Sequence, residues 1–162
     1  MEESRDLSSE EEDLRFAAEC NKAEKIALNL IARAEQNSLG LTFKLEKRGI
    51  EAAVAKSVVS GFLEKNLVND ERYAGLWIRS CLARKTPSPL WLLAALQKRG
   101  IDRETSQKTI KKALDEETEY SLLLKYIKKM DILDNNNKGW LKTRLKFEGF
   151  SPEILDRYFG SI

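Results

Sequence analysis

The residue types that carry out most acid–base and nucleophilic chemistry are scarce in this sequence. It contains no histidine, which removes the commonest general base and a common metal ligand. Cys20 and Cys81 follow no metal-ligand spacing, so we interpret them as free thiols in a reducing compartment. The sequence has no glycine-rich phosphate loop and no Gly-x-Ser-x-Gly motif. It therefore predicts a protein that is not an enzyme, with no catalytic residues, no cofactor and no metal.

Basic side chains are the remaining candidates, as contacts for a partner of opposite charge. They recur along one predicted helix and at the ends of two shorter ones, and we expect these to bind a partner: Arg72, Arg79, Arg84, Lys85, Lys98, Arg99, Lys47 and Arg48. Cations at the end of a helix also interact with the helix dipole, so for the last four both roles stay open. Phosphates and acidic protein surfaces both attract such cations, and the sequence does not separate these two partners.

Charge is distributed unevenly along the chain. Residues 1–20 hold eight acids and two arginines, a balance of −6. The whole chain has 28 Lys+Arg and 26 Asp+Glu, so the other 142 residues carry 26 and 18, a balance of +8. A basic body is compatible with a polyanionic partner. We expect the acidic leader, residues 1–20, to be partly disordered; a helix that starts at a capping-box-like site near Ser8 and Ser9 is the alternative. Whether the leader restrains the basic body stays open.

The composition indicates a folded, cytoplasmic protein that makes no contact with membranes. Hydrophobic residues make up 42% and charged residues 33% of the chain, which is typical of a globular protein. No segment approaches the roughly 18 apolar residues that span a bilayer. The N-terminus lacks the basic start and the apolar stretch of a secretory signal.

The elements that must position the basic residues follow from an internal repeat. The string Leu45-Glu46-Lys47-Arg48-Gly49-Ile50 returns at residues 96–101 and, weakened, at 145–150. Leucines stand eight and four residues before each glycine, a spacing that predicts the buried stripe of a helix. A glycine one turn later is typical of a left-handed residue that ends a helix.

Each repeat is predicted to contain three helices, and we find no segment with the alternation of a strand. We expect helices near these residues: 21–35, 39–48, 51–65, 70–84, 89–99, 102–115, 117–131, 137–148 and 152–159. Asp70, Ser88, Asp102 and Ser151 stand at predicted helix starts. The fold class is therefore all-α, with three tandem three-helix repeats at 21–67, 68–115 and 116–162 that stack into an elongated curved array. A compact helical bundle is the alternative.

Four segments of the chain resemble elements of the RecX family, in that family's order and spacing. They are Val68-Asn69-Asp70-Glu71-Arg72-Tyr73-Ala74 continuing to Arg79, the Leu96-to-Ile101 string, Ala32-to-Leu45, and Leu141-to-Phe150. The sequence departs from the family at Lys85-Thr86-Pro87-Ser88-Pro89, where a glycine turn is common, and at Phe147-Glu148, where basic residues are usual. The second departure weakens the expectation of a positively charged third repeat.

The resemblance implies a regulator that binds RecA filaments on single-stranded DNA and inhibits the ATPase, recombinase and co-protease activities of RecA. The expected partners are the RecA filament and single-stranded DNA, bound directly or through RecA, and we expect a monomer. Two alternatives are a tandem helix-turn-helix-like protein that binds DNA without RecA, and a helical scaffold for another protein.

Aromatic residues have two interpretations. Tyr73 and Trp77, four residues apart, favour a core position over a base-stacking platform, but both stay open. Trp91 and Trp140 each stand nine residues before a repeat glycine, which favours a shared packing role. Arg72 matches a family position, and we expect it to be functional; an ion pair with Asp70 or Glu71 is the alternative.

Overall fold

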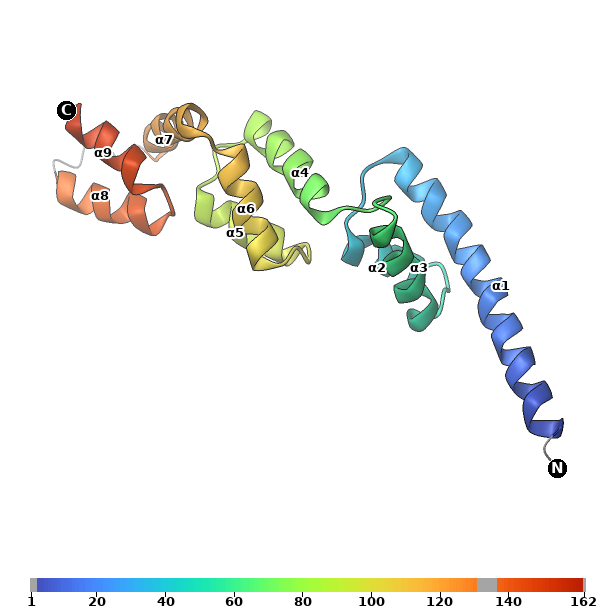
Figure 1. Ribbon diagram of the computed structural model, residues 1–162. Helices are drawn as coiled ribbons and strands as arrows, with labels where there is room; N and C mark the ends of the chain where they lie inside the picture. Colours follow the sequence, from blue (N-terminus) through green and yellow to red (C-terminus); the bar gives the residue numbers. More distant parts are fainter. Residues whose placement is uncertain (1–2, 131–136, 162) are drawn as a thin grey trace. The chain divides into compact units, whose positions relative to one another are not determined.

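The computed structural model describes residues 3–130 and 137–161, with side chains from Ser8 onward, and shows nine α-helices and no strand within these residues (Figure 1). The helices are α1 (Glu3–Arg33), α2 (Ser38–Glu46), α3 (Ala52–Glu64), α4 (Asp70–Arg84), α5 (Pro89–Lys98), α6 (Arg103–Ala113), α7 (Glu116–Lys129), α8 (Lys138–Phe147) and α9 (Pro152–Gly160). The predicted all-α class is confirmed. The chain divides into two compact units, residues 1–73 and 74–162, and each is described by itself.

The three repeat glycines each end a helix in the left-handed conformation, as predicted. Gly49, Gly100 and Gly149 have φ angles of 81°, 85° and 88°. The residue after each glycine donates its backbone N–H to the carbonyl oxygen of the leucine five residues earlier, and the N···O distance is 3.2 Å in all three turns. The glycine amide itself donates to the carbonyl three residues earlier, which completes a Schellman motif. One local sequence therefore sets the same chain reversal three times.

In the first unit, α1, α2 and α3 pack together and form a small hydrophobic core. Leu41 and Leu45, the predicted stripe of α2, are fully buried. Ala23 and Ala27 of α1 are fully buried too, and their small side chains allow the helices to approach closely. Val54 of α3 completes this cluster. The core thus gathers around the C-terminal half of α1.

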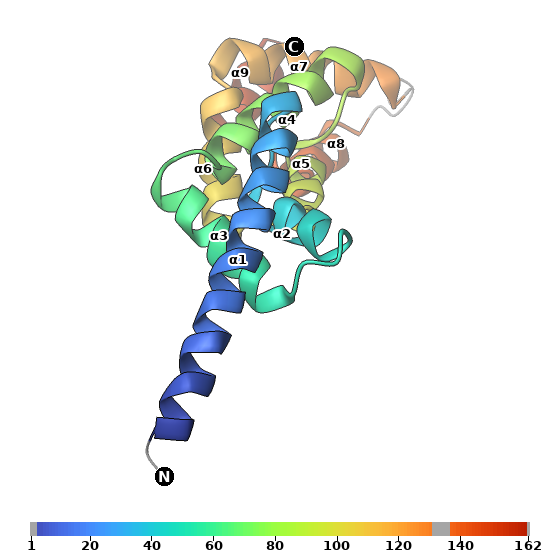
Figure 2. The same ribbon diagram turned by 90° about the vertical axis from the view of Figure 1, so that its right-hand side faces the viewer.

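The predicted start of the first helix near residue 21 is wrong, because α1 begins at Glu3. Its N-terminal half runs on beyond α2 and α3 as a single helix (Figure 2). From Ser8 to Ala18 the side chains are exposed, with Leu14 70% exposed. Glutamates, alanines and leucines favour helix without tertiary contacts, and acids in the first turns interact well with the helix dipole. The acidic leader is helical from Glu3, although its side chains from Ser8 to Ala18 are exposed.

The second unit holds α4 from Ala74 onward together with α5 to α9, and its helix starts show which predicted caps form. Ser88 accepts from the Trp91 amide at 3.2 Å and Asp102 from the Thr105 amide at 2.8 Å, as predicted. Ser151 does not cap with its side chain. Its hydroxyl and its amide instead donate to the two carboxylate oxygens of Glu119, at 2.9 and 2.7 Å. This pair ties the start of α9 to α7.

At the start of α4, in the first unit, the cap is Asn69 rather than Asp70. The Asn69 side chain accepts from the Arg72 amide at 2.8 Å. The Asp70 carboxylate reaches instead to Ser38, whose amide and hydroxyl donate to it at 2.7 and 2.6 Å. Asp70 therefore stabilises the first turn of α2, a tertiary role that its position in the sequence does not reveal.

Candidate functional site

A basic groove lies between α4 and α5 in the second unit. It encloses about 500 Å³, and no carboxylate lines it. Four of the eight predicted partner-binding residues line this groove together, namely Arg84, Lys85, Lys98 and Arg99. The remaining lining residues are Trp77, Cys81, Trp91, Ala94 and Ala95. We call this set the basic groove.

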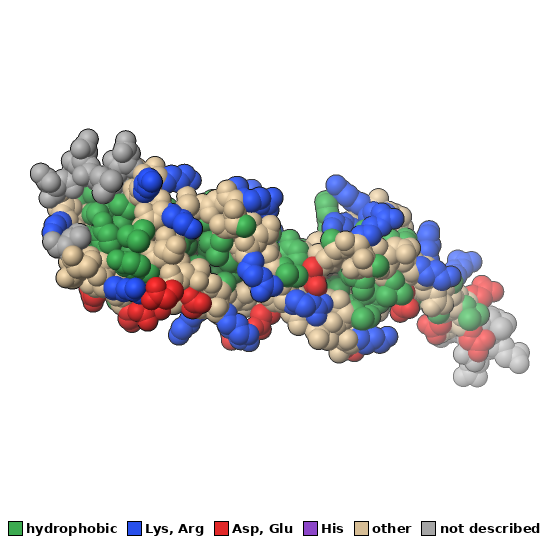
Figure 3. All heavy atoms as spheres, turned by 90° about the horizontal axis from the view of Figure 1, so that it is seen from above, with side chains coloured by type: hydrophobic (Ala, Val, Ile, Leu, Met, Phe, Trp, Pro, Cys, Tyr) green, Lys and Arg blue, Asp and Glu red, His purple; other side chains and the backbone are tan. Residues whose placement is uncertain are grey.

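Helical periodicity brings these residues onto facing surfaces. Trp77, Cys81 and Arg84 are four and three residues apart, which places them on one face of α4. Trp91, the two alanines and Lys98-Arg99 follow the same spacing along α5. The alanines leave room between the helices, so that the long basic side chains border an open groove. Figure 3 shows lysine and arginine side chains at the surface of this unit, with hydrophobic side chains between them.

A pair of tryptophans forms the apolar wall of the groove. The rings of Trp77 and Trp91 are stacked, with centroids 6.1 Å apart and an interplanar angle of 22°. The Arg99 guanidinium lies 4.3 Å from the Trp77 ring centroid, and the Lys85 ammonium 5.4 Å from that of Trp91. Cations within about 6 Å of an indole ring are attracted by about 0.5–2 kcal/mol. The tryptophan pair therefore orients two of the four cations of the groove.

Backbone and hydroxyl groups hold the two arginines further. Arg84 donates to the Ser80 carbonyl at 3.1 Å and to the Ser80 hydroxyl at 2.8 Å. Arg99 donates to the Ala95 carbonyl at 2.9 Å. The carbonyl and hydroxyl of Ser80 are neutral acceptors, so they do not neutralise the charge of Arg84. Such a surface attracts anions.

The buried thiol of Cys81 lies at the floor of the groove. Burial raises the pKa of the Cys81 thiol, and the cations of Lys85, Arg84 and Arg99 act in the opposite direction. The net shift favours the neutral thiol of Cys81. Cys20, half-buried in α1, also has a raised pKa, chiefly because of burial.

The other four predicted residues lie elsewhere. Arg79 is exposed on α4, where Trp77 and Cys81 occupy a different face. In the first unit, Lys47 lies over the Phe43 ring, 4.6 Å from its centroid, and Arg48 donates to the Lys44 carbonyl at 2.9 Å. The cations at the end of α2 thus have local contacts, in line with the alternative of a structural role.

Arg72 takes part in a tertiary ion pair, and the partner is neither of the two neighbours that the sequence suggested. Its guanidinium lies 2.7 Å from the Glu35 carboxylate and donates to the carbonyls of Asn66 and Leu67 at 3.4 and 3.2 Å. The hydrogen bond with Glu35 is the main cause of the raised pKa of Arg72. Arg72 therefore joins the turn before α2 to the turn before α4 within the first unit.

The tryptophans are the part of the groove that the sequence prediction missed. Trp91 and Trp140 are 43% and 45% exposed, and Trp91 stacks on Trp77. The predicted packing role shared by Trp91 and Trp140 stays a prediction. Both stand at the third position of their helices, just before the first buried leucine, which turns them away from the core. The sequence held one sign that Trp91 lines a groove. Trp91 shares a face of α5 with Ala94, Ala95 and Lys98, and this face has no other large apolar residue.

Two other kinds of site are absent from the part of the chain that the structure describes. Among the side chains of residues 8–130 and 137–161, no three or more Cys, Asp or Glu are grouped in a way that could hold a metal ion. Over the same residues, no helix combines the length and the apolar character needed to cross a bilayer.

Comparison with known proteins identifies the family. Residues 69–110, which include the basic groove, match the family described as RecX, second three-helix domain. Over 146 residues the chain is 30% identical to the regulatory protein RecX of Treponema pallidum (strain Nichols), covering 88% of this chain and 86% of that protein. The chain belongs to the RecX family. A second RecX relative, from Neisseria meningitidis serogroup B, is 31% identical over 129 residues, covering 80% of this chain and 83% of its own length.

Solved structures show the same fold. RecX from Lactobacillus salivarius superposes with a TM-score of 0.67 at 21% identity, covering 90% of this chain and 97% of that one. Another structure of regulatory protein RecX gives a TM-score of 0.68 at 15% identity, covering 92% of this chain and 75% of that one. The RecX resemblance noted in the sequence is therefore confirmed, and the helical repeat arrangement agrees with the fold of RecX proteins.

Proposed function

We propose that this RecX-family chain binds the RecA filament on single-stranded DNA and inhibits it without catalysing a reaction of its own. The family supports a regulatory role. The observation that carries the proposal is the basic groove, which lies in the segment that matches the second RecX domain. A groove with four cations and no lining carboxylate suits a nucleic-acid backbone better than a neutral protein surface.

The geometry favours backbone contacts over base recognition. Arg84 is held by the neutral carbonyl and hydroxyl of Ser80, which leaves its charge to attract phosphate. The two tryptophans stack on each other and lie close to cations, so their rings serve to position charge rather than to receive a base. Contacts of this kind fix a protein on nucleic acid without reading its sequence. A regulator of a filament that forms on any sequence needs this property.

The mechanism that we propose is steric and electrostatic. The groove of the second repeat holds the phosphates of the filament DNA, and neighbouring repeats contact RecA subunits. Further RecA cannot then add at that place, and bound subunits cannot complete the changes that accompany ATP turnover. In this proposal the modules are the acidic leader at 1–20 and the repeats at 21–67, 68–115 and 116–162, acting as a cytoplasmic monomer.

The predicted partner contacts divide into two groups under this proposal. The residues of the basic groove, Arg84, Lys85, Lys98 and Arg99, are assigned to phosphate. Arg79, Lys47 and Arg48 are assigned to the RecA surface, because they are exposed but lie outside the basic groove. Arg72 is assigned to holding the first unit together through Glu35.

Filament assembly on single-stranded DNA tests the proposal. RecA carrying a fluorophore is allowed to extend on a long single strand, and the chain is added at a sub-stoichiometric amount. We expect extension to stop, because one bound molecule blocks growth at its place. Extension at the rate seen without the chain would refute the proposal. Tight, sequence-selective binding to duplex DNA in the absence of RecA would favour the tandem helix-turn-helix alternative instead.

A further inference from the structure

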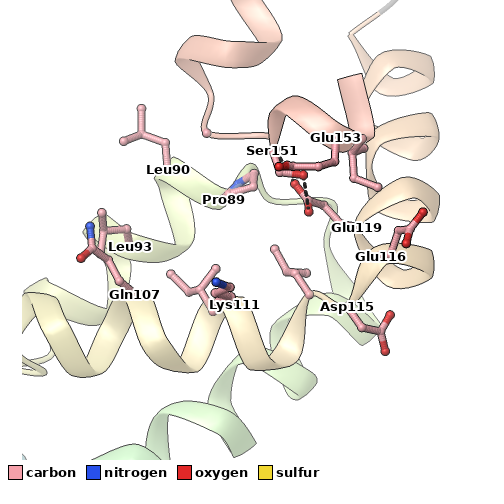
Figure 4. Close-up of a pocket in the computed structure, with 14 residues that line it drawn as sticks. Pro89, Leu90, Leu93, Gln107, Lys111, Asp115, Glu116, Glu119, Ser151 and Glu153 are labelled. Atoms are coloured by element: carbon pink, nitrogen blue, oxygen red, sulfur yellow. Dashed lines mark hydrogen bonds between the residues drawn. The ribbon is translucent and has the colours of Figure 1, made fainter. Parts of the chain in front are cut away.

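A second groove in the same unit has a chemistry opposite to that of the basic groove. It lies between the start of α5, the end of α6, the start of α7 and the start of α9, and it encloses about 760 Å³ (Figure 4). Its apolar lining includes Leu90, Leu93 and Ile110. Leu90 is 40% exposed and the other two are half-buried, so this apolar surface is open to solvent.

The rim of this second groove is acidic. The exposed Asp115, Glu116 and Glu153 line it together with the buried Glu119, against a single cation, Lys111, so the lining charge is four negative and one positive. Glu116 lies 3.5 Å from Arg157, and Glu119 is hydrogen-bonded to Ser151, a neutral group. A nucleic-acid strand is repelled from such a surface, whereas lysines and arginines are attracted to it.

The walls of the groove are held in place by contacts between helices. The Leu90 amide donates to the Glu148 carbonyl at 2.9 Å, which joins the start of α5 to the turn between α8 and α9. Gly149 fits against α5 so closely that an added Cβ would lie 3.2 Å from the Leu90 nitrogen and 3.3 Å from Pro89 Cβ. Figure 4 shows the hydrogen bonding of Ser151, which donates to the Glu119 carboxylate and joins α9 to α7. The groove therefore exists before any partner arrives, which lowers the cost of binding.

We propose that this groove is a docking site for a cationic, amphipathic peptide segment of a protein partner. An apolar side chain of that segment packs on Leu90, Leu93 and Ile110, and lysines or arginines beside it face Glu116 and Glu153. Its volume lies within the range of about 300–1,000 Å³ that is usual for ligand sites. Charge complementarity selects a basic protein segment over nucleic acid. The proposal does not depend on the function proposed above, because it concerns a protein contact on a different surface.

The test is an NMR titration of the full ¹⁵N-labelled chain with a short amphipathic peptide of leucine and lysine. We expect shift changes at the amides of Leu90, Leu93 and Ile110. The matched peptide of leucine and glutamate should leave them unchanged. Changes confined to the exposed acidic part of α1, or equal changes with both peptides, would overturn the proposal. The proposal would also be overturned if an anionic oligonucleotide displaced the lysine peptide and itself shifted the amide resonance of Leu93.

Two pairs of variants locate the site. Glu153→Lys should weaken binding of the lysine peptide roughly five- to tenfold, the effect of reversing one exposed charge at a contact. Its control is Glu104→Lys, since Glu104 stands at the same second position of α6 but outside the groove. Leu90→Lys should weaken binding as well, whereas Leu124→Lys, at a similarly exposed leucine of α7, should not. Equal effects within either pair would contradict the assignment.

Discussion

Replacing two lysines of the basic groove should change the salt dependence of DNA binding by a predictable amount. Each phosphate neutralised on a single strand adds about −0.7 to the slope of log affinity against log salt concentration. With all four groove cations on phosphate, the slope is about −2.8. The double variant Lys85→Ala/Lys98→Ala leaves two cations and a slope of about −1.4. The two arginines remain because the neighbouring Ser80 and Ala95 hold them.

The assay is fluorescence anisotropy of a labelled oligonucleotide, titrated with the full chain at several salt concentrations. Between 50 and 200 mM salt, affinity should fall by about 50-fold for the original chain and by about sevenfold for the double variant. The control is Lys22→Ala/Lys56→Ala, which removes the same charge from exposed positions on α1 and α3. Circular dichroism confirms that both variants are folded. Identical slopes for the groove variant and the control would refute the assignment of the groove to phosphate.

Three further predictions concern stability and the acidic leader. Gly49→Ala should lower the free energy of unfolding in urea by about 1 kcal/mol, because only the left-handed φ is strained. Gly149→Ala should lower it by about 1–3 kcal/mol more, since its Cβ also meets the start of α5. Equal losses of stability for the two variants would contradict this. Thr105 and Thr118 donate hydrogen bonds to the carboxylates of Asp102 and Asp115, and these bonds lower the pKa values of the two aspartates. The two ionised caps therefore stabilise the folded chain fully above the ordinary pKa of 3.8, and this contribution is lost as pH falls below that value. Substituting both by serine should keep the caps and flatten the unfolding free energy in that acid range, and an unchanged pH profile would speak against this linkage. Deleting residues 1–15 should leave the melting temperature unchanged and strengthen filament binding by removing negative charge; markedly weaker binding would rule out a restraining leader.

Local sequence determined the parts of the fold that could be predicted. The leucine stripes and the left-handed glycines were predictable, because a helix and its C-terminal turn are specified within eight or nine residues. The start of α1 was not predictable. The acidic charge pattern of this exposed segment suggested disorder, and the helix propensity and dipole interactions that favour a helix there give only weak signals in the sequence. Asp70 was misassigned because its partner, Ser38, is distant in sequence.

The candidate site was predictable only in part, for the same reason. Its four cations were identified from their recurrence along one predicted helix and their position at the end of the next, but their convergence depends on how α4 and α5 pack. The stacking of Trp77 on Trp91 depends on that packing as well. The acidic rim of the second groove collects residues from α7 and α9 that look like ordinary helix-start acids in the sequence. Sites built between helices need the tertiary structure.

The ATP hydrolysis rate of RecA on single-stranded DNA tests the central claim most directly. The chain is added below the RecA concentration, beside the Lys85→Ala/Lys98→Ala variant and the Lys22→Ala/Lys56→Ala control. We predict that the original chain and the control suppress hydrolysis progressively, and that the groove variant needs a much higher concentration for the same effect. A hydrolysis rate that stays constant across the titration with the original chain would contradict the account.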